Sequence, residues 1–312
     1  MAEINLIKID GKPIQKLIEV ISSGIGTIYK PRAIKKEAEA EAYKIEIIER
    51  AKAKALSEGK EIEADTYSRM QERILHQETK RQLNIDNVSQ IAAEQLSQEQ
   101  NVSDEPVDAD WTSRFFNIVE DVSDEEMQNL WGRILAGEVK QPKSYSIRTL
   151  ELIKNLSKRE AQTFMTVANF AIQSGNGNYL FNTNDDKLLS EKFNINYGDI
   201  SLLIEIGLIQ PGDFVSHQLL QQTTDLQRVF VAGNIIIIAT TKANSPTVLM
   251  PVNVFSNSAN ELLKLVKPAP PMEYLSAIAK SIKNDNVEVK YAMILARDGS
   301  NFRHTKPLLD FE

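Results

Sequence analysis

The chain has 312 residues, 42% of them hydrophobic and 25% charged, which is a composition typical of soluble globular proteins. It contains no cysteine, and this excludes disulfides, thiolate nucleophiles and cysteine-based zinc sites. The formal net charge is −7, which argues against the broad basic surface that non-specific nucleic-acid binding requires.

Residues 1–32 are predicted to contain an amphipathic helix. Apolar residues recur there at steps of three and four, which places them on one helical face: Ile14, Leu17, Ile18, Ile21, Ile25 and Ile28. We expect this face to dock on the protein's own body or on a neighbouring subunit. The alternative is a helix that lies on a membrane surface, although such helices usually carry a richer basic face.

Residues 33–97 are predicted to form a long helical rod. Strong helix formers dominate from Ile34 to Leu83, and Gly59 is the one poor helix former in that stretch. We therefore expect a single helix of about fifty residues, roughly 75 Å long at ~1.5 Å per residue. Asn84 and Asp86 are expected to end it and to cap a second helix, 87–96.

The rod is predicted to pack against other copies of itself, because its apolar stripe is too thin to stand alone in water. Its apolar and small residues mix eleven-residue and seven-residue steps, which disfavours a simple two-stranded heptad coil. The alternative is a single solvated helix. The expected oligomerisation residues are Ile34, Ile45, Ile48, Ala55, Gly59, Ile62, Tyr67 and Met70.

An acidic segment, residues 98–110, is predicted to be a mobile linker and the clearest domain boundary, since it offers little to bury. A helical bundle is expected to follow over residues 111–174. Ser123 with Glu126 and Ser157 with Glu160 each have the spacing of a capping box at a helix start. Short loops between four helices favour an antiparallel arrangement.

Residues 175–267 are predicted to form a winged-helix-like domain. Two short helices, 185–193 and 197–207, precede a strand hairpin, 226–231 with 234–241. A further strand, 248–255, and a helix, 257–266, complete it. Residues 268–312 are expected to add a helix through Ile282 and a strand, 287–295.

No residue pattern indicates an enzyme, a cofactor or a metal. The three histidines, His76, His217 and His304, lie far apart in the sequence, and no Gly-rich phosphate loop is present. One group of acidic residues could in principle hold Mg²⁺, but helix capping explains it equally well: Glu120, Asp121, Asp124, Glu125 and Glu126.

Charge argues against DNA binding by the winged-helix-like region. Between Gly175 and Val266 there are five basic residues, Lys187, Lys192, Arg228, Lys242 and Lys264, against eight acidic ones. The helix 197–207, which would read the major groove, carries Asp199 and Glu205 and no basic residue. We therefore expect this region to bind another protein.

Three blocks of sequence carry a resemblance to a known family. They are Asp110-Trp-Thr-Ser-Arg-Phe-Phe-Asn-Ile-Val-Glu-Asp-Val-Ser-Asp-Glu-Glu-Met, Leu130-Trp-Gly-Arg-Ile-Leu-Ala-Gly-Glu-Val and Ser146-Ile-Arg-Thr-Leu-Glu-Leu-Ile-Lys-Asn-Leu-Ser. The chain resembles a bacterial family of uncharacterised proteins, domain of unknown function 2806, which implies no activity and no catalytic residues. The Glu-Ala repeat after Lys36 is similar in composition to the stalk helices of stomatin and flotillin-like ring proteins.

These observations predict a mainly α protein: an amphipathic helix, a long helix, a helical bundle and a winged-helix-like α+β C-terminal region. The predicted function is a non-enzymatic assembly protein, a homo-oligomer that also binds a protein partner through its C-terminal region. The family resemblance suggests phage defence or prophage biology. The alternatives are a nucleic-acid-binding winged-helix regulator and a membrane-acting effector that uses residues 14–28. No run of eighteen apolar residues occurs, so the expected location is the cytoplasm, with peripheral membrane contact as the alternative.

Overall fold

The computed structural model describes residues 11–26, 34–59, 61–183, 187–212, 215–298 and 301–311. The chain divides into two compact units between Leu150 and Glu151. We call Met1–Leu150 the N-terminal unit and Glu151–Glu312 the C-terminal unit. Each unit is described by itself.

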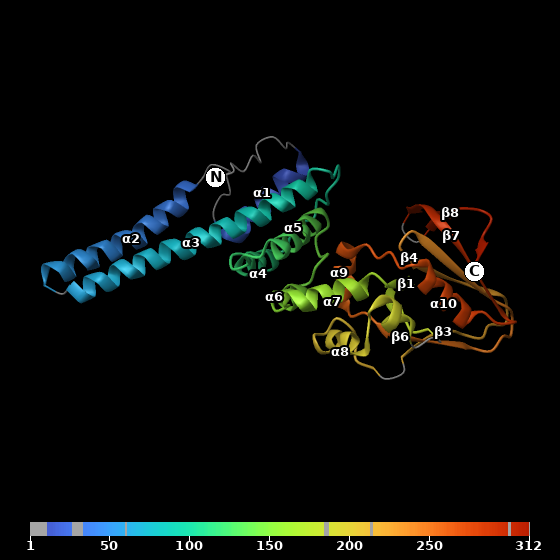
Figure 1. Ribbon diagram of the computed structural model, residues 1–312. Helices are drawn as coiled ribbons and strands as arrows, with labels where there is room; N and C mark the ends of the chain where they lie inside the picture. The colour runs from blue at the N-terminus through green and yellow to red at the C-terminus, as the bar shows by residue number, and fades with distance from the viewer. Residues whose placement is uncertain are drawn as a thin grey trace. The chain divides into compact units, whose positions relative to one another are not determined.

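The N-terminal unit is built from helices (Figure 1). Their bounds are α1 Lys12–Ile25, α2 Ile34–Ser57, α3 Glu61–Leu96, α4 Ala109–Val119 and α5 Glu125–Lys140, and α6, Ile147–Lys154, contains the division between the units. Helices α2 and α3 lie side by side as an antiparallel hairpin, drawn in two shades of blue in Figure 1. The C-terminal part of α3 packs against α4, α5 and α1.

The starts of α4 and α5 are fixed by side-chain caps. The Asp108 carboxylate accepts a hydrogen bond from the Trp111 amide at 2.9 Å, and Asp124 does the same for Met127 at 3.0 Å. Each cap satisfies one of the backbone donors that a helix start leaves free. Asp124, and not Ser123, is thus the N-cap of α5.

Two glycines allow the helices of this unit to approach closely. A Cβ on Gly24 of α1 would lie 2.2 Å from the Phe116 ring of α4, and one on Gly132 of α5 would lie 2.5 Å from Ile91 of α3. These distances are too short for any larger residue, so both crossings depend on glycine. The core they enclose contains Trp131, Phe115 and Leu17, all fully buried.

The C-terminal unit combines helices with one large sheet. Its helices are α7 Lys158–Ala168, α8 Tyr197–Glu205, α9 Asn257–Val266 and α10 Met272–Ile282, and residues 188–192 form one π-helical turn. Its strands are β1 Ile172–Ser174, β2 Gly177–Phe181, β3 Ser216–Leu219, β4 Leu226–Ala232, β5 Ile235–Thr241, β6 Val248–Val254, β7 Val287–Asp298, β8 Asn301–His304 and β9 Leu309–Asp310.

In the described residues the sheet has nine strands in the order β3-β6-β2-β1-β4-β5-β7-β8, with β9 also paired to β7, and all the pairings are antiparallel. Strand β5, Ile235-Ile-Ile-Ile-Ala-Thr-Thr241, is buried almost throughout because it lies between β4 and β7 and is covered on both faces. On one face Ile236 and Ile238 pack with Phe302 and Leu308 from the C-terminal segment.

Helix α10 is anchored to the sheet by a buried tyrosine. The Tyr274 hydroxyl donates a hydrogen bond to the carbonyl of Phe181 in β2, at 2.8 Å. The whole side chain is buried, and burial raises the pKa of the Tyr274 hydroxyl, so it stays protonated and remains a donor. This bond fixes the helix over the strands that carry the aromatic cluster described below.

The structure corrects the predicted fold class. The prediction of a mainly α protein with a winged-helix-like end is wrong, because the C-terminal unit contains a nine-stranded antiparallel sheet in its described part and the fold is α+β. Strands β1, β2, β3, β8 and β9 were missed. They are short, and β2 is buried by a sheet neighbour distant in sequence, with Val252 opposite Phe181.

The prediction of one long helix from Ile34 to Leu83 is also wrong. The chain turns back at Gly59, which has φ +73°, so that α2 and α3 form a hairpin. Glycine reaches this left-handed conformation without the clash that a Cβ causes. Asn84 does not end a helix either: α3 continues to Leu96, since the Asn84 side chain is used in a tertiary contact.

Candidate functional site

The two helices of the hairpin, α2 and α3, bury few side chains in the seam between them, where seam means their contact surface within one chain. We call α2 together with residues 61–83 of α3 the arm. Where side chains of the arm are described, Ala55 and Ala64 are the buried ones, each 4% exposed. Two buried alanine methyl groups contribute only about 2 kcal/mol at ~0.8 kcal/mol per carbon. Half-buried Ile48, Tyr67 and Ile74 extend the seam, but the arm has little core of its own.

Large apolar side chains of the arm face solvent. Ile62 is 83% exposed and Leu56 is 53% exposed. The other exposed members are Ile47, Met70, Leu75 and Leu83. Exposed apolar side chains next to a thin core are typical of a surface that another molecule covers.

The expected oligomerisation residues fall into three groups. Ile48, Ala55 and Tyr67 are half-buried or buried, whereas Ile62 and Met70 are exposed. Gly59 forms the turn, and the side chains of Ile34 and Ile45 lie outside the described residues. Two i,i+4 ion pairs lie on the arm, with 2.5 Å between Arg50 and Glu46 and 2.9 Å between Arg69 and Asp65.

The apolar face of α1 lies within the N-terminal unit. Ile14, Leu17 and Ile21 are buried on α1, which packs against α3, α4 and α5. Ile18 and Ile25 are half-buried, and Ile28 lies outside the described residues. In this conformation the apolar side chains that would enter a membrane are already packed against other helices of the same chain.

Lysines hold the acidic segment, residues 98–110, to the helices. The Lys16 ammonium donates to the carbonyls of Ser103 and Glu105, both at 2.8 Å, and Lys12 pairs with Asp104. Burial lowers the pKa of the Lys16 amine, opposed by nearby Asp104. Lys140 and Lys143 form ion pairs with Glu99 and Glu105. The segment predicted to be a mobile linker thus contacts both α1 and the end of α5.

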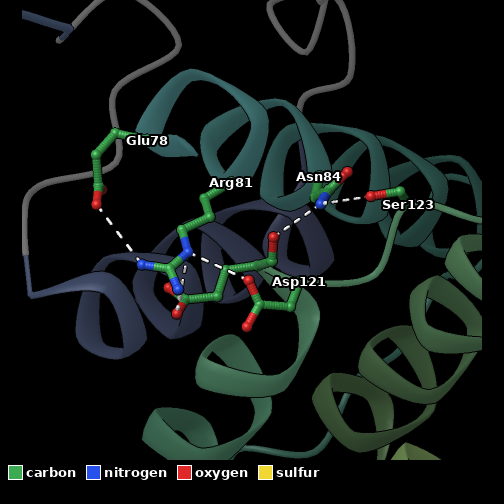
Figure 2. Close-up of polar contacts among 6 residues, drawn as sticks. Glu78, Arg81, Asn84, Asp121 and Ser123 are labelled. Atoms are coloured by element: carbon green, nitrogen blue, oxygen red, sulfur yellow. Dashed lines mark hydrogen bonds and ion pairs between the residues drawn. The ribbon is translucent and has the colours of Figure 1, made fainter. Parts of the chain in front are cut away.

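A polar cluster joins α3 to the turn between α4 and α5 (Figure 2). We call Glu78, Arg81, Asn84, Glu120, Asp121, Ser123 and Gln128 the Asn84 cluster. The Asn84 amide donates to the Glu120 carbonyl at 2.7 Å and lies 3.4 Å from the Ser123 hydroxyl. The Gln128 amide donates to the Asn84 side-chain oxygen at 3.0 Å and to the Val122 carbonyl at 2.9 Å. Asn84 and Gln128 are both buried.

Arg81 lies at the exposed edge of this cluster and is shared by three carboxylates. Its Nε is 3.2 Å from Asp121 and 3.7 Å from Glu120, and its Nη1 is 3.6 Å from Glu78. Partial burial raises the pKa of the Glu120 carboxyl, and the Arg81 charge opposes that shift. The arginine is therefore fully engaged, and the cluster positions a turn instead of presenting a cation to a ligand.

The acidic residues of this turn are used structurally. Glu120 and Asp121 pair with Arg81, while Asp124 caps α5. Among the residues that the structure describes, no group of three or more His, Asp or Glu side chains converges as a metal site.

His217 lies in an aromatic niche of the sheet. Its Nε2 is 3.0 Å from the Ser174 hydroxyl, and the rings of Tyr179 and Phe230 lie 5.1 and 5.4 Å from the imidazole. Burial lowers the pKa of His217, and the Arg228 charge adds to that effect. Nδ1 is buried without a hydrogen-bond partner in the described residues. A nucleophilic serine–histidine pair also needs a group that orients the imidazole, and the described residues place none on Nδ1.

The other two histidines lie elsewhere. His76 is exposed on α3, and His304 is on β8, where its Nδ1 is 2.9 Å from the Thr305 carbonyl. Among the described helices, none is both long enough and apolar enough to span a bilayer. The sequence could have indicated the His217 niche only through the alternation of Tyr179 and Phe181, since Ser174 and Phe230 come from other strands.

Comparisons with known proteins place the chain in one family. Searches of curated proteins and of solved structures gave no match. A family model described as "Protein of unknown function (DUF2806)" matches residues 68–279, about two thirds of the chain. The match begins within α3 and ends within α10, so it includes the Asn84 cluster and the His217 niche. The chain therefore belongs to the family described as Protein of unknown function (DUF2806).

Proposed function

We propose that this protein is a non-enzymatic interaction protein that assembles with other copies of itself through the arm. The observation that carries the proposal is that the buried side chains of the arm are small, whereas several of its exposed side chains are large and apolar. Ala55 and Ala64 are buried, whereas Leu56 and Ile62 next to them in sequence face solvent. Association of arms would bury these larger side chains, and each would contribute about 1.5–3 kcal/mol if it became fully buried.

The charges of the arm are compatible with a solvated surface that packs against the arm of another copy. Positive and negative side chains alternate along both helices, as in Glu46/Arg50 and Asp65/Arg69. A helix that carries charges of both signs can pack against an identical helix without bringing like charges together.

The proposal also includes a second surface, on the C-terminal unit, which binds a protein partner. The proposed location is the cytoplasm.

The argument for a nucleic-acid regulator depended on a winged helix, whereas the described part of the C-terminal unit forms a nine-stranded antiparallel sheet. The argument for a membrane-acting effector needs the face of α1 that contains Ile14, Leu17 and Ile21. Since these residues are buried against α3–α5, membrane contact would first require α1 to leave the unit. We therefore place self-association ahead of both alternatives.

The test is the solution mass of the full chain, measured by light scattering at micromolar concentration. Replacing three exposed apolar residues, Leu56→Gln, Ile62→Gln and Met70→Gln, should convert an oligomer to a smaller species. Gln keeps a helix propensity close to that of Leu and Met, and far-UV circular dichroism should show that the fold is retained.

A matched control replaces three exposed polar residues of the same helices, Ser57→Gln, Thr66→Gln and His76→Gln. This variant should keep the wild-type mass. A wild-type protein that is strictly monomeric, or a mass that is equal in both variants, would contradict the proposal.

A further inference from the structure

The sheet of the C-terminal unit has an open edge at β3. Strand β3 pairs with β6, where His217 lies opposite Met250, and the Val252 amide donates to the Val215 carbonyl at 2.9 Å. In an antiparallel pair, alternate residues direct their N–H and C=O groups to the same neighbour. The backbone groups of Ser216 and Gln218 therefore point away from β6. Within the described chain no strand pairs with them.

Apart from its short length of four residues, this edge strand lacks the features that usually protect a sheet edge. Edge strands are commonly blunted by lysine, proline, bulges or charged side chains. Residues 215–224, Val-Ser-His-Gln-Leu-Leu-Gln-Gln-Thr-Thr, contain no acidic residue, lysine, arginine, proline or glycine. Burial lowers the pKa of His217, so this histidine adds no charge near neutral pH.

The opposite edge of the same sheet is protected in several ways. It is divided between two separate strands, β8 and β9, and a register shift interrupts β7 between Ile294 and Ala296. Charged Arg303 and Asp310 lie on these strands, with Lys306 and Pro307 between them. The β3 edge has no comparable bulge, proline or charged side chain in residues 215–224.

Apolar side chains surround the open edge. Leu249, which lies directly opposite Gln218 in the sheet, is 59% exposed. Val215 and Leu220, at the two ends of β3, are also exposed. On the inner side, His217 is held by Ser174 and the aromatic rings, so the strand is fixed before any partner arrives. A preorganised strand loses less conformational entropy on binding.

We propose that the β3 edge pairs antiparallel with the β3 edge of a second copy, and so joins two C-terminal units about a twofold axis. Such pairing places equivalent residues opposite each other, and like charges there would repel. Strand β3 carries none. With Gln218 on the axis, Gln218 faces its own counterpart, whose side-chain amide both donates and accepts, and Ser216 faces Leu220.

This contact is separate from the arm, and the two can be tested apart in the full chain. Gln218→Pro removes an N–H that points to the open edge, a position where a strand tolerates proline, while Gln218→Thr keeps that donor. Each of the two Gln218 substitutions is made in two backgrounds. One has the wild-type arm, and the other has the arm variant Leu56→Gln, Ile62→Gln, Met70→Gln. In the arm-variant background, Gln218→Thr should be dimeric. Gln218→Pro should dimerise about tenfold more weakly or not at all, since two symmetric hydrogen bonds are lost.

Cross-linking gives a second readout that does not depend on proline. Because the chain has no cysteine, an oxidised Gln218→Cys variant should form a covalent dimer on a non-reducing gel. The control Gln162→Cys, at an exposed position of α7, should not. Equal masses for Gln218→Pro and Gln218→Thr in both backgrounds, or no cross-link through Cys at 218, would overturn the proposal. If the arms do not associate but the β3 edges do, the arm variant has the same mass as the wild type. Gln218→Pro and Gln218→Thr then still differ in mass.

Discussion

At the scale of single residues, burial decides which polar side chains stabilise the N-terminal unit. Asn84 and Arg81 both contact the turn between α4 and α5, and Arg81 has the larger number of charged partners. Arg81 is exposed to solvent, where ion pairs are worth about 0–1 kcal/mol. Asn84 is buried, and its removal takes a donor from the Glu120 carbonyl and one of two acceptors from the Gln128 amide.

We therefore expect Asn84→Ala to lower the free energy of unfolding of the N-terminal unit by about 1–3 kcal/mol. Arg81→Gln should lower it by less than about 1 kcal/mol. Tryptophan fluorescence during urea unfolding measures this unit alone, because both tryptophans of the chain, Trp111 and Trp131, are buried in it. An equal effect of the two substitutions would show that burial does not separate them.

At the scale of elements, the turn at Gly59 converts a predicted rod into a hairpin. Ser57, Glu58 and Gly59 follow a run of good helix formers, and no proline marks the break. Gly59 adopts φ +73°, and a Cβ there would meet no atom within 4 Å, so only the backbone conformation demands glycine. The left-handed conformation costs an L-residue about 1–2 kcal/mol.

Spin labels measure this turn directly. Labels on Ile47→Cys and Glu72→Cys should be separated by about 10 Å between helix axes in a hairpin, against roughly 38 Å in a continuous helix at ~1.5 Å per residue. Gly59→Ala should reduce the short-distance population, whereas Gly59→Asn should preserve more of it. A second pair within α3, Glu72→Cys with Gln90→Cys, is the control and should stay near 27 Å. A long distance in the wild type would contradict the hairpin.

The elements also show what the sequence could and could not predict. Local signals placed α9 at Asn257–Val266 and the capping box of Ser157 with Glu160, and both are confirmed. Contacts between residues distant in the sequence could not be predicted from these local signals. The acidic segment contacts Lys12 and Lys16, about ninety residues earlier, and β3 pairs with β6, about thirty residues later. The sheet was underestimated for the same reason, because strand pairing is decided by tertiary contacts.

The same limit applies to the candidate site. The expected oligomerisation set included Ala55 and Tyr67, which fill the seam inside one chain, together with Ile62, which faces outward. Periodicity alone could not separate these roles, because both kinds of residue lie on apolar positions of a helix. Leu56 and Leu75 are exposed but were not in that set, since exposure depends on where the second helix of the hairpin lies.

At the scale of the whole molecule, the division between Leu150 and Glu151 separates two cores with different chemistry. The N-terminal unit depends on close helix crossings at Gly24 and Gly132. The C-terminal unit depends on a sheet with α10 fixed to it through the Tyr274 hydroxyl. Each unit has a hydrophobic core of its own, as expected of a domain that can fold by itself.

Two matched substitutions test whether the units unfold separately. Asn84→Ala should shift the unfolding of the N-terminal unit alone. Tyr274→Phe removes the buried donor to the Phe181 carbonyl and should lower the stability of the C-terminal unit alone, by about 1–3 kcal/mol. Hydrogen–deuterium exchange followed by mass spectrometry resolves the effects, with α5 reporting on the first unit and β5 on the second. If either substitution accelerates exchange equally in α5 and β5, the chain unfolds as one cooperative body, because mutations in independent domains do not share their effects.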